Sequence, residues 1–269
     1  MHKPTLSAVV CAHNEERSLE RCLLSLGFAD EIVVLLDRCT DGSREIAQRY
    51  ADRIITGAFP QEGPRRAAAV LGATSDWIIE LDADEEASLV LAHEIRARIA
   101  EPDGGDYFQI PVDNYVGDNL IRHGWGGSFG TTSVARLFRR GGKAWGAEKV
   151  HPSVRFLGQE GARLATPIAH RMDVDIADML GRFERYTALR AVDLRLKPKG
   201  GVASNVFRAF RRFFKCYVAR KGYREGEWGF LIALLAALYP LVSTLRARLE
   251  ETQVVEEVEL PQLQTQAAE

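Results

Sequence analysis

Two aspartates separated by one residue, Asp82 and Asp84, follow the apolar run WIIEL in the segment LDADE. The run has the character of a buried strand, and α/β folds bind ligands at the carboxyl ends of their strands. Two carboxylates at such a place suit a hard divalent cation, Mg²⁺ or Mn²⁺, which bridges phosphate oxygens and stabilises the charge of a departing diphosphate. The alternative is an acidic first turn for the next helix, which the helix dipole favours.

Charged residues also stand at the ends of two other predicted elements. Asp37 follows a second apolar run in EIVVLLDRCTDGS, and its carboxylate could accept hydrogen bonds from a nucleobase or a ribose. Arg65 and Arg66 begin an alanine-rich helix, where a guanidinium suits a diphosphate. Alternatively, Asp37 starts a turn and the two arginines are a solvated surface pair. Together with the aspartate pair, these groups predict a site for a nucleotide diphosphate and a metal ion.

The elements that must position these residues alternate between strand and helix patterns over the first hundred residues. Buried strands are predicted at residues 6–11, 31–36, 53–56 and 77–81. Asn14 is expected to cap the first helix and Pro64 to open the third. Short links between alternating elements predict an α/β fold with a doubly wound, mostly parallel sheet. Beyond Pro102, glycine becomes more frequent, and strands are predicted at 107–112 and 134–138. This pattern indicates an α+β extension.

The order of these motifs resembles the inverting family 2 glycosyltransferases, which have the GT-A fold. The resemblance is carried by AVVCAHNEE, EIVVLLDRCTDGS and LDADE. Later segments, VARLFRR, AWGAEKVHPSV and LATPIAH, are similar to the branch that glycosylates lipopolysaccharide core. The resemblance implies transfer of a sugar from a nucleotide diphosphate sugar, expected to be a UDP-sugar. The implied acceptor is a lipid-linked or cell-envelope glycan, such as lipopolysaccharide core or exopolysaccharide.

By position, the resemblance implies that Ala12, Glu15 and Asp37 line the nucleoside pocket and that Arg65 approaches the diphosphate. It also implies that Asp82 and Asp84 form the metal-binding pair, with Asp84 the more direct ligand and Asp82 also in contact with the substrate. Three residues depart from the family pattern: Leu36 in place of an aspartate, Arg66 in place of an asparagine, and Pro152 in place of a glutamate.

An inverting transfer needs one carboxylate that takes the proton from the acceptor hydroxyl. We predict that Glu148 is this base, because its segment WGAEKVH lies in the later, acceptor-side half of the chain. Glu148 could equally be a surface carboxylate. Glu85, Asp113 and Asp118 are alternative bases.

Histidine and tryptophan residues of the same half could complete the site. His151 and His170 are candidate third metal ligands, although a lone histidine is more often structural. Trp125 and Trp145 are candidates to stack on a sugar face, and the alternative is an aromatic core.

The last third of the chain differs in composition, and a helix is predicted at 175–196 before it. Residues 195–224 contain ten Lys or Arg and no Asp or Glu, with phenylalanines interleaved. Such a segment suits an anionic membrane surface. Residues 228–245 have no charge, but Pro240 and the borderline length favour surface contact over a full span. The net charge of −2 and the lack of a recognised motif argue against a nucleic-acid partner.

We therefore predict a glycosyltransferase domain over 1–195, with a nucleotide-sugar half (1–100) and an acceptor half (101–195). A helical membrane-associated segment (196–249) and a disordered tail (250–269) follow it. The N-terminus has the pattern of a buried strand rather than a signal peptide, so a cytoplasmic protein at the inner face of the plasma membrane is expected.

Two other functions are consistent with parts of the pattern. A nucleotidyltransferase normally has a glycine-rich basic loop after its first strand, where this chain has CAHNEE. A non-catalytic membrane scaffold with a degenerate nucleotide pocket would fit the departures at Leu36 and Pro152.

Overall fold

The computed structural model describes residues 3–102, 104–125, 131–146, 153–196 and 200–250. Contacts divide the chain into two units. Among the described residues, unit 1 contains those of 1–112 and 133–170, and unit 2 contains those of 113–132 and 171–250. The helix over 176–196 belongs to the same unit as the C-terminal helices. The domain limits near residues 100, 195 and 249 stay a prediction.

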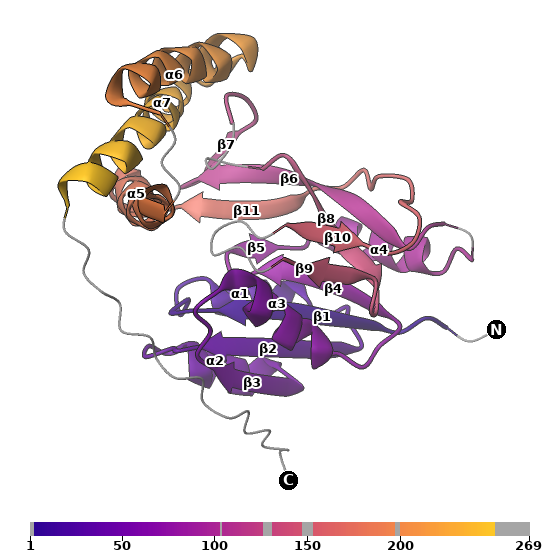
Figure 1. Cartoon of the computed structure of the whole chain (residues 1–269). Helices are drawn as coiled ribbons and strands as arrows, with labels where there is room; N and C mark the ends of the chain where they lie inside the picture. The colour runs from indigo at the N-terminus through magenta and orange to yellow at the C-terminus, as the bar shows by residue number, and fades with distance from the viewer. Residues whose placement is uncertain (1–2, 103, 126–130, 147–152, 197–199, 251–269) are drawn as a thin grey trace. The chain divides into compact units, whose positions relative to one another are not determined.

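Unit 1 is built on a mixed sheet (Figure 1), with strand order β3-β2-β1-β4-β8-β6-β11-β5. The first four strands are parallel: β1 (Leu6–Ala12), β2 (Glu31–Asp37), β3 (Arg53–Gly57) and β4 (Trp77–Asp82). Next to β4, β8 (Ser133–Arg139) and β6 (Tyr107–Val116) pair antiparallel. The predicted α/β fold with parallel strands first and an α+β extension later is confirmed.

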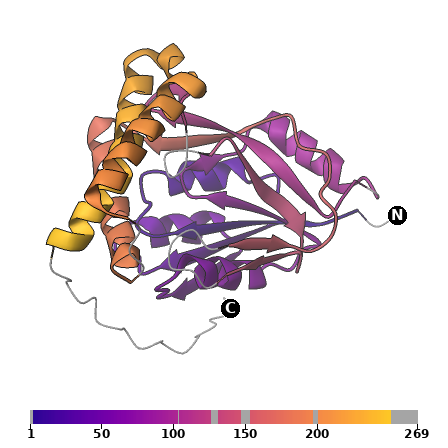
Figure 2. The ribbon, with the colours of Figure 1, turned by 45° about the horizontal axis from the view of Figure 1, so that its top comes forward.

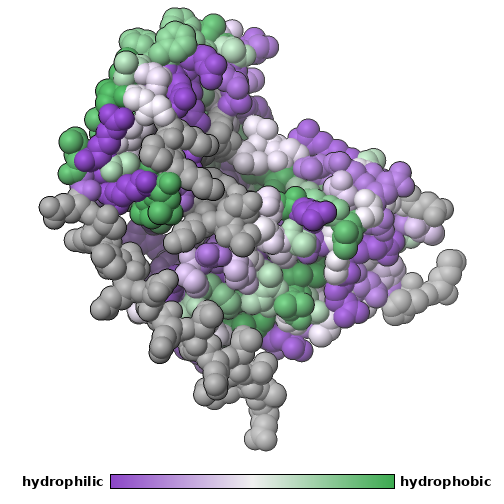
Figure 3. Space-filling model, in the orientation of Figure 1, coloured by the Kyte–Doolittle hydropathy of each residue, from purple (hydrophilic) through white to green (hydrophobic). Residues whose placement is uncertain are grey.

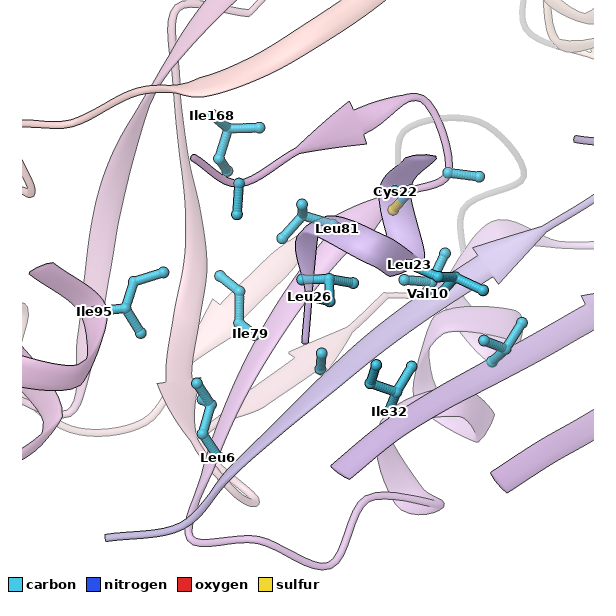
Figure 4. Close-up of a cluster of buried hydrophobic side chains, with 14 of the residues drawn as sticks. Leu6, Val10, Cys22, Leu23, Leu26, Ile32, Ile79, Leu81, Ile95 and Ile168 are labelled. Carbon is cyan, nitrogen blue, oxygen red and sulfur yellow. The ribbon is translucent and has the colours of Figure 1, made fainter. Parts of the chain in front are cut away.

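Helices cover both faces of the parallel strands. α1 (Leu19–Ser25), α2 (Ser43–Tyr50) and α4 (Leu89–Ile99) contribute to one hydrophobic core, and α3 (Glu62–Leu71) contributes to the other. Because successive strand residues point to opposite faces, Val10 of β1 lies in the first core and Val9 in the second. Figure 4 shows the first core, where Val10 lies close to Leu23 of α1.

Several short strands were not predicted. They are β5 (Glu85–Glu86), β7 (Asn119–Ile121), β9 (Lys143–Trp145), β10 (Val154–Phe156) and β11 (Ile168–Asp173). Four of them have two or three residues, which is too short to show a period in the sequence, and β11 has six. One of them matters for the site, because β5 pairs antiparallel with β11 and sets His170 opposite Glu85.

Two predicted helix starts are wrong. α1 begins at Leu19, after Ser18, and not at Asn14. Asn14 instead adopts a left-handed conformation with φ of 58°, and its side-chain oxygen accepts a hydrogen bond from the backbone N–H of Thr40 at 2.8 Å. α3 begins at Glu62, two residues before Pro64.

Unit 2 is mainly helical. α5 (Ile176–Leu196) and α6 (Val202–Phe214) both pack against α7 (Gly226–Leu249), and Figure 2 shows the three helices together. The predicted helical C-terminal segment is therefore confirmed. Within the described residues, Gly222–Leu249 is long and apolar enough to cross a membrane, but 50% of its apolar window is buried inside the protein. Contact of this segment with a membrane stays a prediction.

Substitution of Ser88 tests how α4 begins. Its hydroxyl caps the helix by accepting a hydrogen bond from the Leu91 N–H at 3.1 Å. Ser88→Ala is expected to lower the free energy of unfolding by about 1 kcal/mol, measured by urea denaturation. The matched control is Ser18→Ala, because Ser18 precedes α1 without a side-chain capping bond; a loss within about 0.5 kcal/mol is expected there. Equal losses would contradict a capping role for Ser88.

Candidate functional site

Asp37 ends β2 and is 1% exposed. Its Oδ1 accepts hydrogen bonds from the backbone N–H of Phe59 at 3.0 Å and from Nε of Arg38 at 2.9 Å. Nη1 of Arg65 lies 3.5 Å from Asp37 Oδ2. The carboxylate predicted to bind the nucleoside and the guanidinium predicted to bind the diphosphate are therefore neighbours in the structure.

The other two predicted nucleoside residues lie at the same edge of the sheet. Ala12 ends β1 and pairs in register with Leu36 of β2. Glu15 is partly exposed, and its backbone N–H donates to the hydroxyl of Ser43 at 2.9 Å. Since β1 and β2 run parallel, both residues lie at the carboxyl edge, where α/β folds bind ligands.

Asp82 has a different environment from the one predicted. Its Oδ1 accepts a hydrogen bond from Nη2 of Arg66 at 2.8 Å, and its Oδ2 is paired with Nη2 of Arg136. Burial alone would raise the pKa of Asp82, but Arg136 and Arg66 outweigh it and hold the pKa well below its usual range. The carboxylate is thus ionised and already neutralised by two arginines. Direct metal ligation by Asp82 would require these ion pairs to open, so it stays a prediction.

The ion pairs of Asp82 belong to a larger cluster around Glu80 of β4, which is 2% exposed. Nη1 of Arg66 lies 2.6 Å from Glu80 Oε1, and Nζ of Lys143 is paired with Glu80 Oε2. Burial opposes ionisation of Glu80, but the cations of Arg66, Lys143 and Arg136 lower its pKa to about 2. Glu80, Arg136 and Lys143 were missed from the sequence, although a charge inside an apolar strand such as WIIEL or VARLF signals a buried ion pair.

Within the described residues, Asp84 forms no ion pair with these arginines. Its Oδ2 is 3.3 Å from Nε2 of His170, and the two side chains are 34% and 19% exposed. Burial disfavours the imidazolium, but the hydrogen bond with Asp84 and the charges of Asp84 and Glu85 raise the pKa of His170. The β5–β11 pairing therefore brings together two of the predicted metal ligands that are far apart in the chain.

The pair of Asp84 and His170 fits a divalent ion that takes few ligands from the protein. Within the described part of the chain, no group of three His, Cys, Asp or Glu residues is placed to hold a metal. Mg²⁺ usually binds one or two carboxylates, with substrate phosphates and water as its other ligands. Two buried guanidinium Nε atoms nearby, of Arg65 and Arg136, have no hydrogen-bond partner in the described structure, which suits an anionic ligand.

Three of the four candidates for the catalytic base, Glu85, Asp113 and Asp118, are among the described residues. Glu148, the predicted base, and His151, a predicted metal ligand, lie outside the described residues. Asp113 and Asp118 belong to unit 2. Glu85 lies in the cluster of unit 1, where burial raises its pKa to about 7 against the effect of Arg136.

Trp125 is not placed to stack on a sugar. Its ring is 4% exposed, packs in the core of unit 2, and donates a hydrogen bond from Nε1 to the carbonyl of Ile121. The prediction that Trp125 contacts the substrate is corrected: the indole is a core side chain, because a buried Trp with a satisfied N–H has no free face. Trp145 is partly buried beside the second core of unit 1, with Nζ of Lys143 4.9 Å from its ring centre.

The site therefore combines carboxylates and arginines at the ends of parallel strands, with a carboxylate–imidazole pair beside them. The family model described as Glycosyl transferase family 2 matches residues 7–156, more than half of the chain. The chain belongs to glycosyl transferase family 2. It is a glycosyltransferase that uses a nucleotide-sugar donor.

Two glycosyltransferases are distantly similar to this chain. It is 24% identical to lipopolysaccharide core biosynthesis glycosyltransferase LpsC of Rhizobium meliloti (strain 1021), over 91% of this chain and 92% of LpsC. It is 29% identical to an uncharacterized glycosyltransferase of Rickettsia bellii (strain RML369-C), over 40% of this chain and 37% of that protein.

A solved structure is more distant. Glucosyl-3-phosphoglycerate synthase from Mycobacterium tuberculosis, in complex with Mg²⁺ and uridine diphosphate, matches 42% of this glycosyltransferase and 44% of its own chain. The TM-score is 0.34 and the identity 21%.

Proposed function

We propose that this glycosyltransferase moves a sugar, with inversion, from a UDP-sugar to lipopolysaccharide core or a related lipid-linked glycan of the cell envelope. The observation that carries the proposal is the Asp84–His170 pair in the unit that also holds Asp37 and Arg65. The acceptor is supported by the similarity to LpsC, which extends over 91% of the chain and so includes both units. We place the enzyme in the cytoplasm, at the inner face of the plasma membrane, without a nucleic-acid partner.

Each residue of the site would have a distinct task. Asp37 would accept a hydrogen bond from the nucleoside, and the guanidinium of Arg65 would bind diphosphate oxygens. Asp84 and His170 would hold Mg²⁺ or Mn²⁺, which supplies charge stabilisation for the leaving diphosphate when bound. The carboxylate of Asp82, fixed by two arginines, keeps lone pairs that could accept a hydrogen bond from a sugar hydroxyl.

The transfer itself needs a base on the acceptor side. The acceptor oxygen forms a bond to the anomeric carbon as the bond to the diphosphate oxygen breaks, and the diphosphate leaves with the electron pair. The base takes the hydroxyl proton. Glu148 remains the proposed base because its segment lies on the acceptor side of the chain.

A panel of nucleotide sugars tests this function. We expect slow hydrolysis of one UDP-sugar in the presence of Mn²⁺ or Mg²⁺, loss of that hydrolysis on chelation, and recovery when the metal is added back. The same enzyme given UTP and sugar 1-phosphates should release no pyrophosphate. Nucleotide binding without turnover of any donor would favour the non-catalytic scaffold, and pyrophosphate release would favour a nucleotidyltransferase.

A further inference from the structure

Helix α6 presents two opposite apolar faces. Its inner face packs on α7: Nδ2 of Asn205 donates to the hydroxyl of Thr244 at 3.0 Å, and the rings of Phe213 and Phe230 are 5.7 Å apart. Asn205 is 2% exposed, and Phe213 is partly buried. These contacts fix which side of α6 faces the rest of unit 2.

The outer face of α6 consists of Phe207, Phe210 and Phe214, which are 71%, 65% and 62% exposed. They are three and four residues apart, so a helix with 3.6 residues per turn places them in one row. The same rotation places this row about half a turn from Asn205. A rigid helix cannot bury both faces against α7, so the phenylalanine row remains on the surface of unit 2.

Cationic side chains flank this row. Arg211 and Lys215 are exposed, and within the described residues neither forms an ion pair with a carboxylate. The sequence around them, residues 195–224, holds ten Lys or Arg and no Asp or Glu. Figure 3 shows hydrophobic and hydrophilic side chains next to one another where α6 lies in Figure 1. Exposed phenylalanines beside cationic side chains are not needed by a helix that only packs in a protein core. They are typical of a helix that lies in a membrane interface.

We propose that the outer face of α6, formed by Phe207, Phe210 and Phe214 with Arg211 and Lys215 beside it, docks onto a lipid bilayer that contains anionic head groups. The phenylalanine rings enter the boundary between head groups and acyl chains, and the cations contact lipid phosphates. The positive charge of the segment favours an anionic bilayer over an apolar groove of another protein. α7, which is apolar but packed between α5 and α6, supports α6 rather than crossing the bilayer.

This inference deepens the proposed function, since an enzyme that acts on a lipid-linked acceptor must reach the membrane surface. Vesicle binding needs no catalysis, however, so the two can fail separately. Full-length protein is expected to float with vesicles of phosphatidylcholine and phosphatidylglycerol, and not with vesicles of phosphatidylcholine alone. Raising the salt concentration should weaken this binding.

Two sets of substitutions separate the contribution of the phenylalanines to vesicle binding from that of the cations. Phe207→Ser, Phe210→Ser and Phe214→Ser combined should weaken vesicle binding by more than about 100-fold. Arg211→Gln with Lys215→Gln should weaken it by about 30-fold. The matched control is Leu71→Ser with Leu89→Ser, which removes two leucines that are 85% and 81% exposed on unit 1 and should leave binding unchanged.

Other outcomes would overturn the inference. If the phenylalanine variant binds vesicles as tightly as the wild type, α6 is not the docking element. A second outcome is that the wild type does not bind vesicles but forms a dimer, and that the phenylalanine variant is a monomer. The outer face of α6 would then bind a second copy of the chain. Metal-dependent donor hydrolysis without vesicles should be equal in wild type and all three variants; its absence in the wild type would instead count against the proposed function.

Discussion

Replacement of Asp84 by alanine is expected to lower metal-dependent hydrolysis of the donor by at least about 100-fold. The carboxylate lies 3.3 Å from His170 and away from the two arginines that occupy Asp82. Of the two aspartates of LDADE, Asp84 is therefore the one that can bind an ion without breaking an ion pair with an arginine. Initial rates at saturating Mn²⁺ measure the effect, and Mn²⁺ affinity of the same variant is measured by electron paramagnetic resonance.

The control for this substitution is Glu45→Gln, which removes one exposed carboxylate from α2. It should change neither turnover nor Mn²⁺ affinity. If Asp84→Ala keeps both at the wild-type level, the ion does not bind at this end of β4. If turnover is lost while Mn²⁺ affinity is unchanged, Asp84 acts on the donor and not on the metal.

The sequence predicts the parallel half of the fold well because its strands are buried on both faces. Continuous apolar runs bounded by polar residues locate β1, β2 and β4, and the residues after them fall at the carboxyl edge. Asp37 could be located for this reason, and Arg65, from the first turn of α3, lies 3.5 Å from it. The apolar runs locate the parallel strands, and the carboxyl ends of parallel strands lie at one edge of the sheet. The sequence therefore also predicts where the residues after these strands lie.

Contacts that depend on antiparallel pairing could not be predicted. β5 has two residues, and its pairing with β11 sets His170 opposite Glu85 and 3.3 Å from Asp84. The ion pair of Arg136 with Asp82 likewise needs β8 to lie beside β4. A motif such as DxD shows that carboxylates are present, but not whether arginines from later strands neutralise them. The resemblance to the family implies Asp84 as the more direct ligand, but the sequence could not show that Asp82 is held by Arg66 and Arg136.

Substitution of Glu80, in the buried charged cluster, is expected to lower the free energy of unfolding strongly. Glu80→Gln keeps the shape of the side chain but leaves Arg66 and Lys143, which are 13% and 5% exposed, without their buried partner. Breaking one member of a buried ion cluster costs about 3–5 kcal/mol. The lowered pKa gives a similar figure, because about 2 in the folded state against 4.5 corresponds to about 3 kcal/mol. Urea denaturation at pH 7, where the wild-type carboxylate is ionised, measures this loss.

The matched control is Glu62→Gln, which removes another partner of Arg66, 2.8 Å away, from a side chain that is 32% exposed. Water screens this pair, so a loss of about 0.5 kcal/mol is expected. The pH dependence gives an independent check. A carboxyl with a lowered folded-state pKa stabilises the protein above its unfolded pKa, and that stability disappears as pH falls towards the folded value. The difference between wild type and Glu80→Gln should therefore shrink as pH falls from about 4.5 towards 2. Equal losses from the two substitutions at pH 7 would show that burial of Glu80 adds nothing to the strength of the cluster.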